Sequence, residues 1–307
     1  MRIKFWGVRG SIATPGASTV KYGGNTACTE LHLDDENRNI HDGRVHLLIL
    51  DAGTGIRNLG NDLMEHNQKI SAHIFITHPH WDHIQGFPFF KPAFVEGNDL
   101  TILGPEARGI KLSELIAEQM NKIYFPVRLS ELKAKINFLP LKEDCTEVQG
   151  AEVKSFYVNH PGFTLGYKIT HNNKALVYIS DNEPFSVEAS EHFANGEPEV
   201  LGLFRQYHGD PNNRVVDFIR GADVLIHDTT YTPEQYAEHV GWGHSHYLYT
   251  LRLATRAGVK NLFLFHYDPS LSDHDVDDMV ARSNAEMKKS GYSFRLFASK
   301  EGMEFEF

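Results

Sequence analysis

Cysteine, long apolar runs and leader signals are scarce or absent in this sequence. Its 307 residues include only two cysteines, Cys28 and Cys145, far apart and without C-x-x-C spacing. This excludes a disulfide framework or a cysteine-rich zinc site, and we expect both thiols to be small buried hydrophobes. No apolar run approaches membrane-spanning length, and the first residues enter a strand pattern without a cleavage site, so we expect a cytoplasmic protein.

Positive charge is also in deficit, since the formal net charge is −10. Binding a nucleic-acid backbone draws on clustered Lys and Arg, so the balance argues against a long nucleic acid as partner. A small anionic substrate in a metal-lined pocket stays compatible, because bound ions supply positive charge locally. The hydrophobic content of 41% is that of an ordinary globular protein with a sizeable core.

Metal-binding side chains are dense in one segment, Thr77–His83, which follows the apolar run Ile74–Ile76. In an extended loop His78 and His80 point the same way, whereas Asp82 and His83 diverge, so one loop can supply two neighbouring ions. The alternative is a solvated surface turn, which the proline, the tryptophan and the flanking apolar residues disfavour.

The same segment resembles the metallo-β-lactamase superfamily, because Thr77–His83 matches its T-H-x-H-x-D-H signature in full. The resemblance implies an α/β fold, a four-layer αββα sandwich, with a two-metal site at one edge. It also implies further ligands downstream, at the ends of strands.

The downstream strand-like runs end in residues of the expected types: His160, Asp181 and His266. The resemblance implies that one metal takes His78, His80 and His160, that the other takes Asp82, His83 and His266, and that Asp181 bridges them. Asp51 would brace the histidine loop, since ligating imidazoles need their other N–H held; the alternative is an Asp that only starts a turn. Zinc suits such a site best, although His and Asp sites also accept manganese or iron.

A further histidine is a candidate for leaving-group chemistry. Gly243-His244-Ser245 resembles the H-S-T motif of ribonuclease Z and its phosphodiesterase relatives, in which the histidine acts on the scissile phosphate. His246 replaces the threonine, which leaves open which of His244 and His246 acts. The alternative is that neither histidine has a catalytic role. We expect Ser245 to cap the following helix.

A glycine-rich N-terminal stretch adds to the resemblance. Phe5–Ser11 with Gly23–Thr26 is similar to the opening of a phosphodiester-cleaving branch of the superfamily. Tight turns explain these glycines as well as substrate contact does. Candidate substrate contacts are Asn25, Thr26, Ser245 and His246.

The pattern of strands and helices predicts one domain, 1–307, with an insertion around 183–222 that forms one or two helices outside the sandwich. Residues 28–33 and 45–50 are expected to pair as strands. Thr232-Pro233-Glu234-Gln235 is a strong helix start.

These observations favour a dinuclear-metal phosphodiesterase that hydrolyses a small cyclic or nucleotide phosphodiester through a metal-bridging hydroxide, with Asp82 and His244 as candidate catalytic residues. An RNA-processing nuclease of the ribonuclease Z type is the first alternative, although the basic glycine-rich arm of those enzymes is not evident. A thioester or lactone hydrolase of the same fold, and a nucleotide-binding protein without turnover, are the others. Homodimerisation is implied only by the family.

Overall fold

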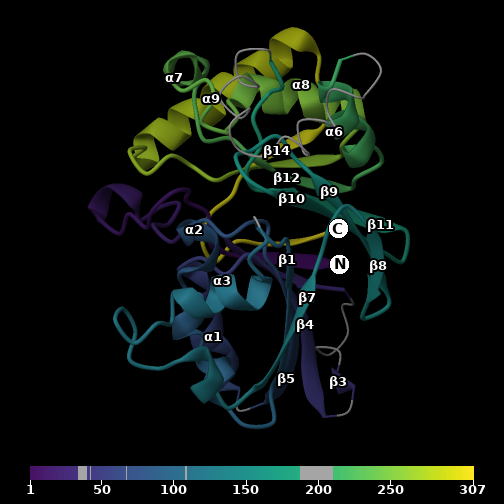
Figure 1. Cartoon of the computed structure of the whole chain (residues 1–307). Coiled ribbons are helices and arrows are strands. Elements are labelled where there is room, and N and C mark those ends of the chain that lie inside the picture. The colour runs from purple at the N-terminus through teal and green to yellow at the C-terminus, as the bar shows by residue number, and fades with distance from the viewer. Residues whose placement is uncertain (34–39, 42, 67, 108, 187–209) are drawn as a thin grey trace.

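Alternating apolar residues along the strands build two mixed β-sheets that pack face to face (Figure 1). The computed structural model describes residues 1–33, 40–41, 43–66, 68–107, 109–186 and 210–307. The first sheet has the order β15 (Glu304–Glu306), β1 (Arg2–Gly7), β2 (Cys28–His32), β4 (Arg44–Leu50), β5 (Lys69–Phe75), β6 (Asp99–Gly104) and β7 (Lys135–Pro140), with β3 (Ile40–His41) beside β4.

The second sheet comes from the later part of the chain. Its order is β14 (Arg295–Ala298), β13 (Asn261–Phe265), β12 (Val224–Asp228), β11 (Lys174–Ile179), β10 (Leu165–His171), β9 (Ala151–Tyr157) and β8 (Cys145–Val148). Strands β4 to β7 run parallel in the first sheet, as do β11 to β14 in the second. Parallel strands bring their carboxyl ends to one edge, where ligand sites form.

Strand β4 shows how the layers are specified. Leu48 and Leu50 join the core between the sheets, whereas Leu47 and Ile49 join the core beneath the helices of the first sheet. Successive side chains of a strand point to opposite faces, so one apolar run serves both layers.

Helices cover the outer face of each sheet. The helices α1 (Gly55–Glu65) and α3 (Leu112–Glu118) pack on the first, and α6 (Asn212–Ile219), α8 (Tyr247–Ala257) and α9 (Asp273–Ser290) pack on the second (Figure 1). The short helices α2 (Trp81–Ile84) and α7 (Pro233–Glu238) lie in loops. The predicted four-layer αββα arrangement is confirmed.

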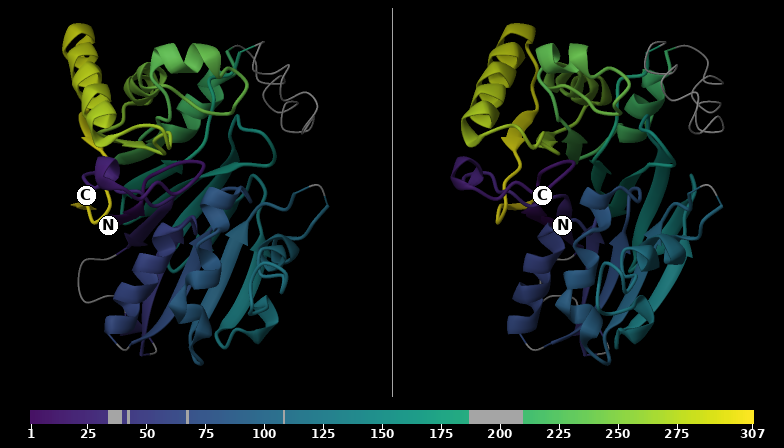
Figure 2. Two further views of the ribbon diagram at one scale, coloured as in Figure 1. Left: turned by 90° about the vertical axis from the view of Figure 1, so that its left-hand side faces the viewer. Right: turned by 60° about the vertical axis from the view of Figure 1, so that its left-hand side comes forward.

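The two ends of the chain lie side by side (Figure 2), because β15 pairs antiparallel with β1. The amide of Phe307 donates to the carbonyl of Met1 at 3.0 Å. The last strand therefore completes the sheet that the first strand begins.

Several local predictions are confirmed and others are wrong. Strands β2 and β4 pair antiparallel, and the Thr232 hydroxyl caps α7 as expected. Cys28 is buried, but Cys145 is exposed, because β8 is an edge strand that the sequence pattern did not reveal. No helix in the described part of the chain is long and apolar enough to cross a membrane.

The region 183–222 is only partly described, since residues 187–209 lie outside the described residues. Its last part forms α6, with Val215, Val216 and Ile219 buried in the core. This helix belongs to the outer layer of the second sheet, so the expectation that the whole region lies outside the sandwich is wrong for α6.

Candidate metal centre

The carboxyl ends of five parallel strands surround one point between the sheets. Asp51 follows β4, the histidine loop follows β5, Asp181 follows β11, Asp228 ends β12, and His266 follows β13. The His and Asp side chains among these are at most 5% exposed, apart from His80 in the loop. The fold thus buries acidic and imidazole groups where two sheets converge.

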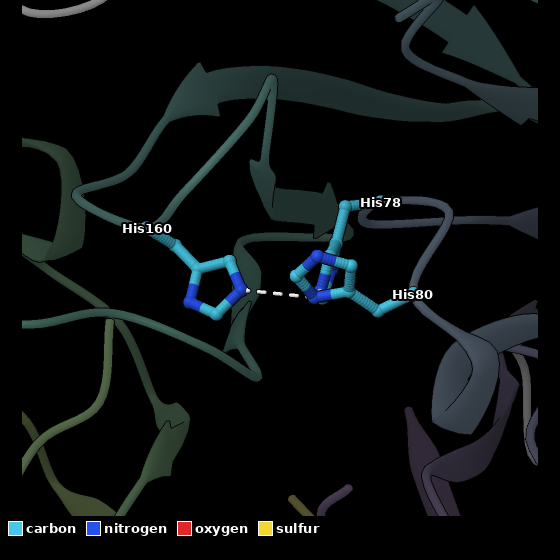
Figure 3. A group of neighbouring side chains, drawn as sticks. All are labelled: His78, His80 and His160. Carbon is cyan, nitrogen blue, oxygen red and sulfur yellow. Dashed lines mark hydrogen bonds between the residues drawn. The ribbon is translucent and has the colours of Figure 1, made fainter. Parts of the chain in front are cut away.

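Three imidazoles form the first cluster (Figure 3). His78 Nε2 lies 2.8 Å from His80 Nδ1, and His160 Nε2 lies 3.2 Å from the same atom. His78 and His80 leave the loop on one side, as their spacing predicts, and His160 reaches them from the segment after β9. Three ring nitrogens therefore converge within one coordination sphere.

A second cluster lies beside the first and contains Asp82, His83 and His266. Asp82 Oδ2 is 3.2 Å from His83 Nε2 and 3.1 Å from His266 Nε2. The backbone amide of Ser11 donates to the same carboxylate oxygen at 2.7 Å, which anchors the N-terminal loop to the site.

Asp181 stands between the clusters. Its Oδ1 lies 3.2 Å from His83 Nε2, and its Oδ2 lies 3.7 Å from His78 Nε2 and 3.5 Å from His266 Nε2. A single buried carboxylate thus faces both groups of imidazoles.

Four of the five imidazole rings in the two clusters donate a hydrogen bond through Nδ1, which fixes their orientation. His83 Nδ1 donates to Asp51 Oδ2 at 2.8 Å, and His160 Nδ1 donates to the carbonyl of Gly243 at 2.8 Å. The remaining two, His78 and His266, donate to the hydroxyls of Thr77 and Thr230, both at 3.1 Å. Each threonine hydroxyl itself donates to a carboxylate, that of Asp51 or Asp228, so its lone pair is free to accept. This fixes the tautomers and leaves each Nε2 lone pair directed at the centre, as in metal sites.

The backbone around Asp51 and His266 adopts conformations that suit the close packing of the site. Asp51 and His266 have φ of 60° and 63°, in the left-handed region that non-glycine residues rarely adopt. Gly10 packs so closely on the His266 ring that a Cβ there would lie 2.3 Å from it. The glycine of the N-terminal signature therefore has a close-packing role beside the site.

The protonation states of four ligand candidates match metal binding, and His83 is the exception. Burial lowers the pKa of His83, but the carboxylates of Asp82, Asp181 and Asp51 outweigh it and raise the pKa well above its ordinary value, so a metal would have to displace a proton from this ring. Burial lowers the pKa of His160 to about 3 and lowers that of His78 well below its ordinary value, so both rings are neutral. Burial raises the pKa of Asp82 and Asp181, but the nearby histidines outweigh it and hold both pKa values well below the ordinary range. Neutral imidazole and ionised carboxylate are the forms that bind metal.

The residues present fit two divalent cations. Within the described residues, His83 Nε2 and Asp181 Oδ1 are buried and have no hydrogen-bond partner, although they face each other. Buried polar atoms without partners are costly, and a cation between them would satisfy both. Imidazole nitrogen with carboxylate oxygen is the donor set of zinc and of other borderline divalent metals.

His244 lies against the clusters without joining the first ring of donors. Its Nδ1 donates to Asp228 Oδ2 at 3.0 Å and lies 3.8 Å from Asp181 Oδ2. Burial lowers the pKa of His244, but the carboxylates of Asp228, Asp181 and Asp82 outweigh it and raise the pKa to about 9. Within the described part of the chain, its other nitrogen, Nε2, has no hydrogen-bond partner and is available for a ligand.

His244 and His246 lie in different surroundings, and His246 does not line the cavity over the metal centre. His246 packs against Tyr236 at 5.0 Å between ring centroids, and burial lowers its pKa to about 4. It is also the residue that precedes the first turn of α8. The prediction that Ser245 caps this helix is wrong, because the Ser245 hydroxyl donates to the carbonyl of Asn182 instead.

The other candidate substrate contacts are directed elsewhere. Asn25 donates through its backbone and side-chain nitrogens to the carboxylate of Glu301, at 2.7 and 2.9 Å. The Thr26 hydroxyl is fully buried and accepts from the amide of Thr54 at 2.8 Å. Neither side chain lines the cavity over the metal centre.

That cavity has a volume of about 450 Å³. It is lined by Ser11, Pro79, His80, Trp81, Asp82, Asp181 and His244. It therefore opens onto both clusters and onto His244.

Sequence reasoning missed two acidic residues beside the site. Asp228, the partner of His244, ends a buried apolar strand just as Asp51 and Asp181 follow theirs, and that signal was available. Glu183 is 1% exposed and accepts from the amides of Gly241 and Gly243 at 2.7 and 2.8 Å. Nothing local in the sequence links Glu183 to this loop.

Comparisons with known proteins concern the family of the sequence and its fold. The family model described as "Beta-lactamase superfamily domain" matches residues 46–201. A curated protein from Thermoplasma volcanium named "Ribonuclease Z" is 32% identical over 262 residues, which cover 76% of this chain and 79% of that protein. Among solved structures, the metallo-β-lactamase fold protein YhfI from Bacillus subtilis has a TM-score of 0.65 at 16% identity, covering 99% of both chains. Human tRNase Z, short form, has a TM-score of 0.61 at 18% identity, covering 100% of this chain and 99% of that one. At such low identities the two structures show a shared fold.

Proposed function

The chain belongs to the metallo-β-lactamase superfamily of metal-dependent hydrolases, and from this premise we propose that it hydrolyses a small cyclic or nucleotide phosphodiester at a two-metal centre. The single observation that carries the proposal is the pairing of His244 with Asp228 at 3.0 Å, beside the cavity over the two clusters.

Seven residues would hold the ions. One ion would take His78, His80 and His160, the other would take Asp82, His83 and His266, and Asp181 would contact both. Two divalent ions there would lower the pKa of a water molecule from about 15.7 to about 7 and would stabilise charge on a phosphoryl group. Zinc is the proposed metal on the donor set, with manganese or iron as alternatives.

His244 supplies the proton for the departing oxygen. The Asp228 carboxylate fixes the ring through Nδ1, so Nε2 is the nitrogen that donates. Burial lowers the pKa of His244, but the Asp228 carboxylate raises it, which favours a second proton on the ring. General acid catalysis of this kind contributes about 10²–10⁴-fold in rate.

The loop that carries His244 is itself anchored. Glu183 holds the amides of Gly241 and Gly243, and the Gly243 carbonyl in turn holds the His160 ring. A metal-ligand candidate and the proton donor are thereby fixed by one loop, which keeps the acid at a constant position over the clusters.

A small substrate is supported by charge. Among the described residues, no Lys or Arg lines the cavity, and the formal net charge is −10. Gripping a polynucleotide backbone normally requires clustered positive charge.

RNA processing is the second candidate function, favoured by the similarity to curated proteins named "Ribonuclease Z". A carbonyl-ester hydrolase is less well supported, since an acid fixed for the leaving group is what a phosphodiester with a poor leaving group needs.

The test is an assay of the metal-loaded protein against cyclic mononucleotides, bis(p-nitrophenyl) phosphate, a precursor transfer RNA, a thioester and a lactone. The proposal expects turnover of the small phosphodiesters and its loss in Asp181→Ala. Turnover of the RNA alone would establish the second candidate instead, and turnover of the thioester or lactone alone would refute both.

Two accompanying proposals concern the whole chain. We propose that residues 1–307 form one catalytic domain and that the protein is a homodimer. Limited proteolysis and light scattering on a sizing column test them: separable fragments would contradict the first, and a monomeric mass would contradict the second.

A further inference from the structure

Trp81 has an unusual position for a large apolar side chain. It begins α2, where the next three residues, Asp82, His83 and Ile84, are buried. The indole itself is 78% exposed and lines the cavity beside His80 and Asp82. The backbone that positions the metal-ligand candidates thus also places Trp81 beside the site.

Packing does not explain the residue. The chain has three tryptophans, and the other two have side-chain partners. Trp6 donates to Glu30 Oε2 at 2.8 Å, and the Trp242 ring lies 4.8 Å from that of His239. Among the described residues, the Trp81 indole has no hydrogen-bond or ring partner. An exposed apolar side chain without a packing role, set in a concave site, is typical of a ligand contact.

The composition of the cavity indicates what the ligand contact is. Its lining combines titratable residues, Asp82, Asp181, His80 and His244, with two apolar ones, Trp81 and Pro79. A phosphodiester has a charged centre and two organic groups. With the phosphoryl group over the clusters and the departing oxygen at His244, the apolar residues of the lining are left for the organic group that remains on phosphorus.

We propose that Trp81 is a stacking platform for a planar heterocyclic group, a nucleobase, carried by the phosphodiester substrate. Indole presents a large flat π face, and bases stack on such faces largely independently of their identity. The subsite therefore selects nucleotide-type phosphodiesters over aliphatic ones without selecting one base. This inference rests on the proposed phosphodiesterase function.

A matched pair of substrates tests it. Thymidine monophosphate p-nitrophenyl ester and methyl p-nitrophenyl phosphate share a leaving group, and only the first carries a base. In Trp81→Ala, kcat/KM for the thymidine ester should fall by about 5- to 150-fold, the range of one base–aromatic stack, and kcat/KM for the methyl ester should be unchanged. Trp81→Phe, which keeps an aromatic face, should retain most of the activity on the thymidine ester.

Tyr124→Ala is the control, since Tyr124 is 80% exposed and does not line the cavity. Its kinetics on both substrates should match those of the unmodified protein. An equal loss on both substrates in Trp81→Ala would overturn the stacking role. So would a change in oligomeric mass with no change in the preference for the thymidine ester, which would assign Trp81 to an interface.

A binding measurement separates failure of this inference from failure of the proposed function. Calorimetric titration of the metal-loaded protein with adenosine monophosphate needs no turnover. If neither ester is cleaved but Trp81→Ala weakens adenosine monophosphate binding by the same factor, the platform stands and the phosphodiesterase proposal fails. If the esters are cleaved and neither nucleotide affinity nor substrate preference depends on Trp81, the platform alone is refuted.

Discussion

Replacing His244 by alanine should slow the reaction in proportion to how badly the leaving group needs a proton. Asp228 Oδ2 holds His244 Nδ1 at 3.0 Å, which leaves Nε2 to donate. Burial lowers the pKa of the ring, but the Asp228 carboxylate raises it and favours the protonated form. Removal of this acid should lower kcat by about 10²–10⁴-fold when the leaving group is an alkoxide, the full range of general acid catalysis. A p-nitrophenolate leaving group is stable without a proton, so its kcat should fall far less.

The assay compares His244→Ala with the unmodified protein on cyclic mononucleotides and on bis(p-nitrophenyl) phosphate, at fixed metal content. Metal analysis of both proteins is essential, because the His244 ring lies against Asp181. His246→Ala is the matched control, since its ring packs on Tyr236 and does not line the cavity. An equal loss on both kinds of substrate with metal retained would refute the assignment of a proton donor.

Three further predictions concern the buried carboxyl groups of Asp51, Glu183 and Glu30. Asp51→Asn should weaken metal affinity by about 10- to 100-fold, measured by competition with a chelator, because this carboxylate holds the His83 ring at 2.8 Å. Glu183→Gln should lower kcat while the metal content stays the same, because the new amide cannot accept from both Gly241 and Gly243, and unchanged kinetics would contradict that positioning role. Burial raises the pKa of Glu30, but hydrogen bonds and charge from His32 and Trp6 outweigh burial and lower the pKa. The ionised Glu30 therefore stabilises the folded state above the unfolded pKa, and this stabilisation is lost as pH falls through the lower folded pKa. Thermal melts across the acid range should accordingly show a smaller decline for Glu30→Gln than for the unmodified protein.

Local sequence carried much of the fold and of the metal centre. The composition of the segment Thr77–His83 is enough to predict a metal site. The side chains of His78 and His80 point to the same side of the loop, as predicted (Figure 3). Strand runs ending in Asp or His located Asp181 and His266, because parallel strands bring such residues to one edge. These features depend on residues within a few positions of each other.

The remaining features depend on tertiary contacts that no local pattern contains. Asp228 is separated by 16 positions from His244, and only the path of the chain around α7 brings the two together. Asn25 follows a plausible signature, yet Glu301, from the far end of the chain, accepts its hydrogen bonds. Ser245 is a good helix cap by type, but the buried carbonyl of Asn182 competes for its hydroxyl. In each case the deciding partner is distant in sequence.

The most direct measurement of the central claim is a metal titration of the metal-free protein with turnover of a cyclic mononucleotide as the readout. Two clusters that share Asp181 predict that activity rises until two equivalents of divalent metal are bound, and that Asp181→Ala abolishes the activity. Full activity with one equivalent, or no phosphodiester turnover with two equivalents bound, would contradict the account.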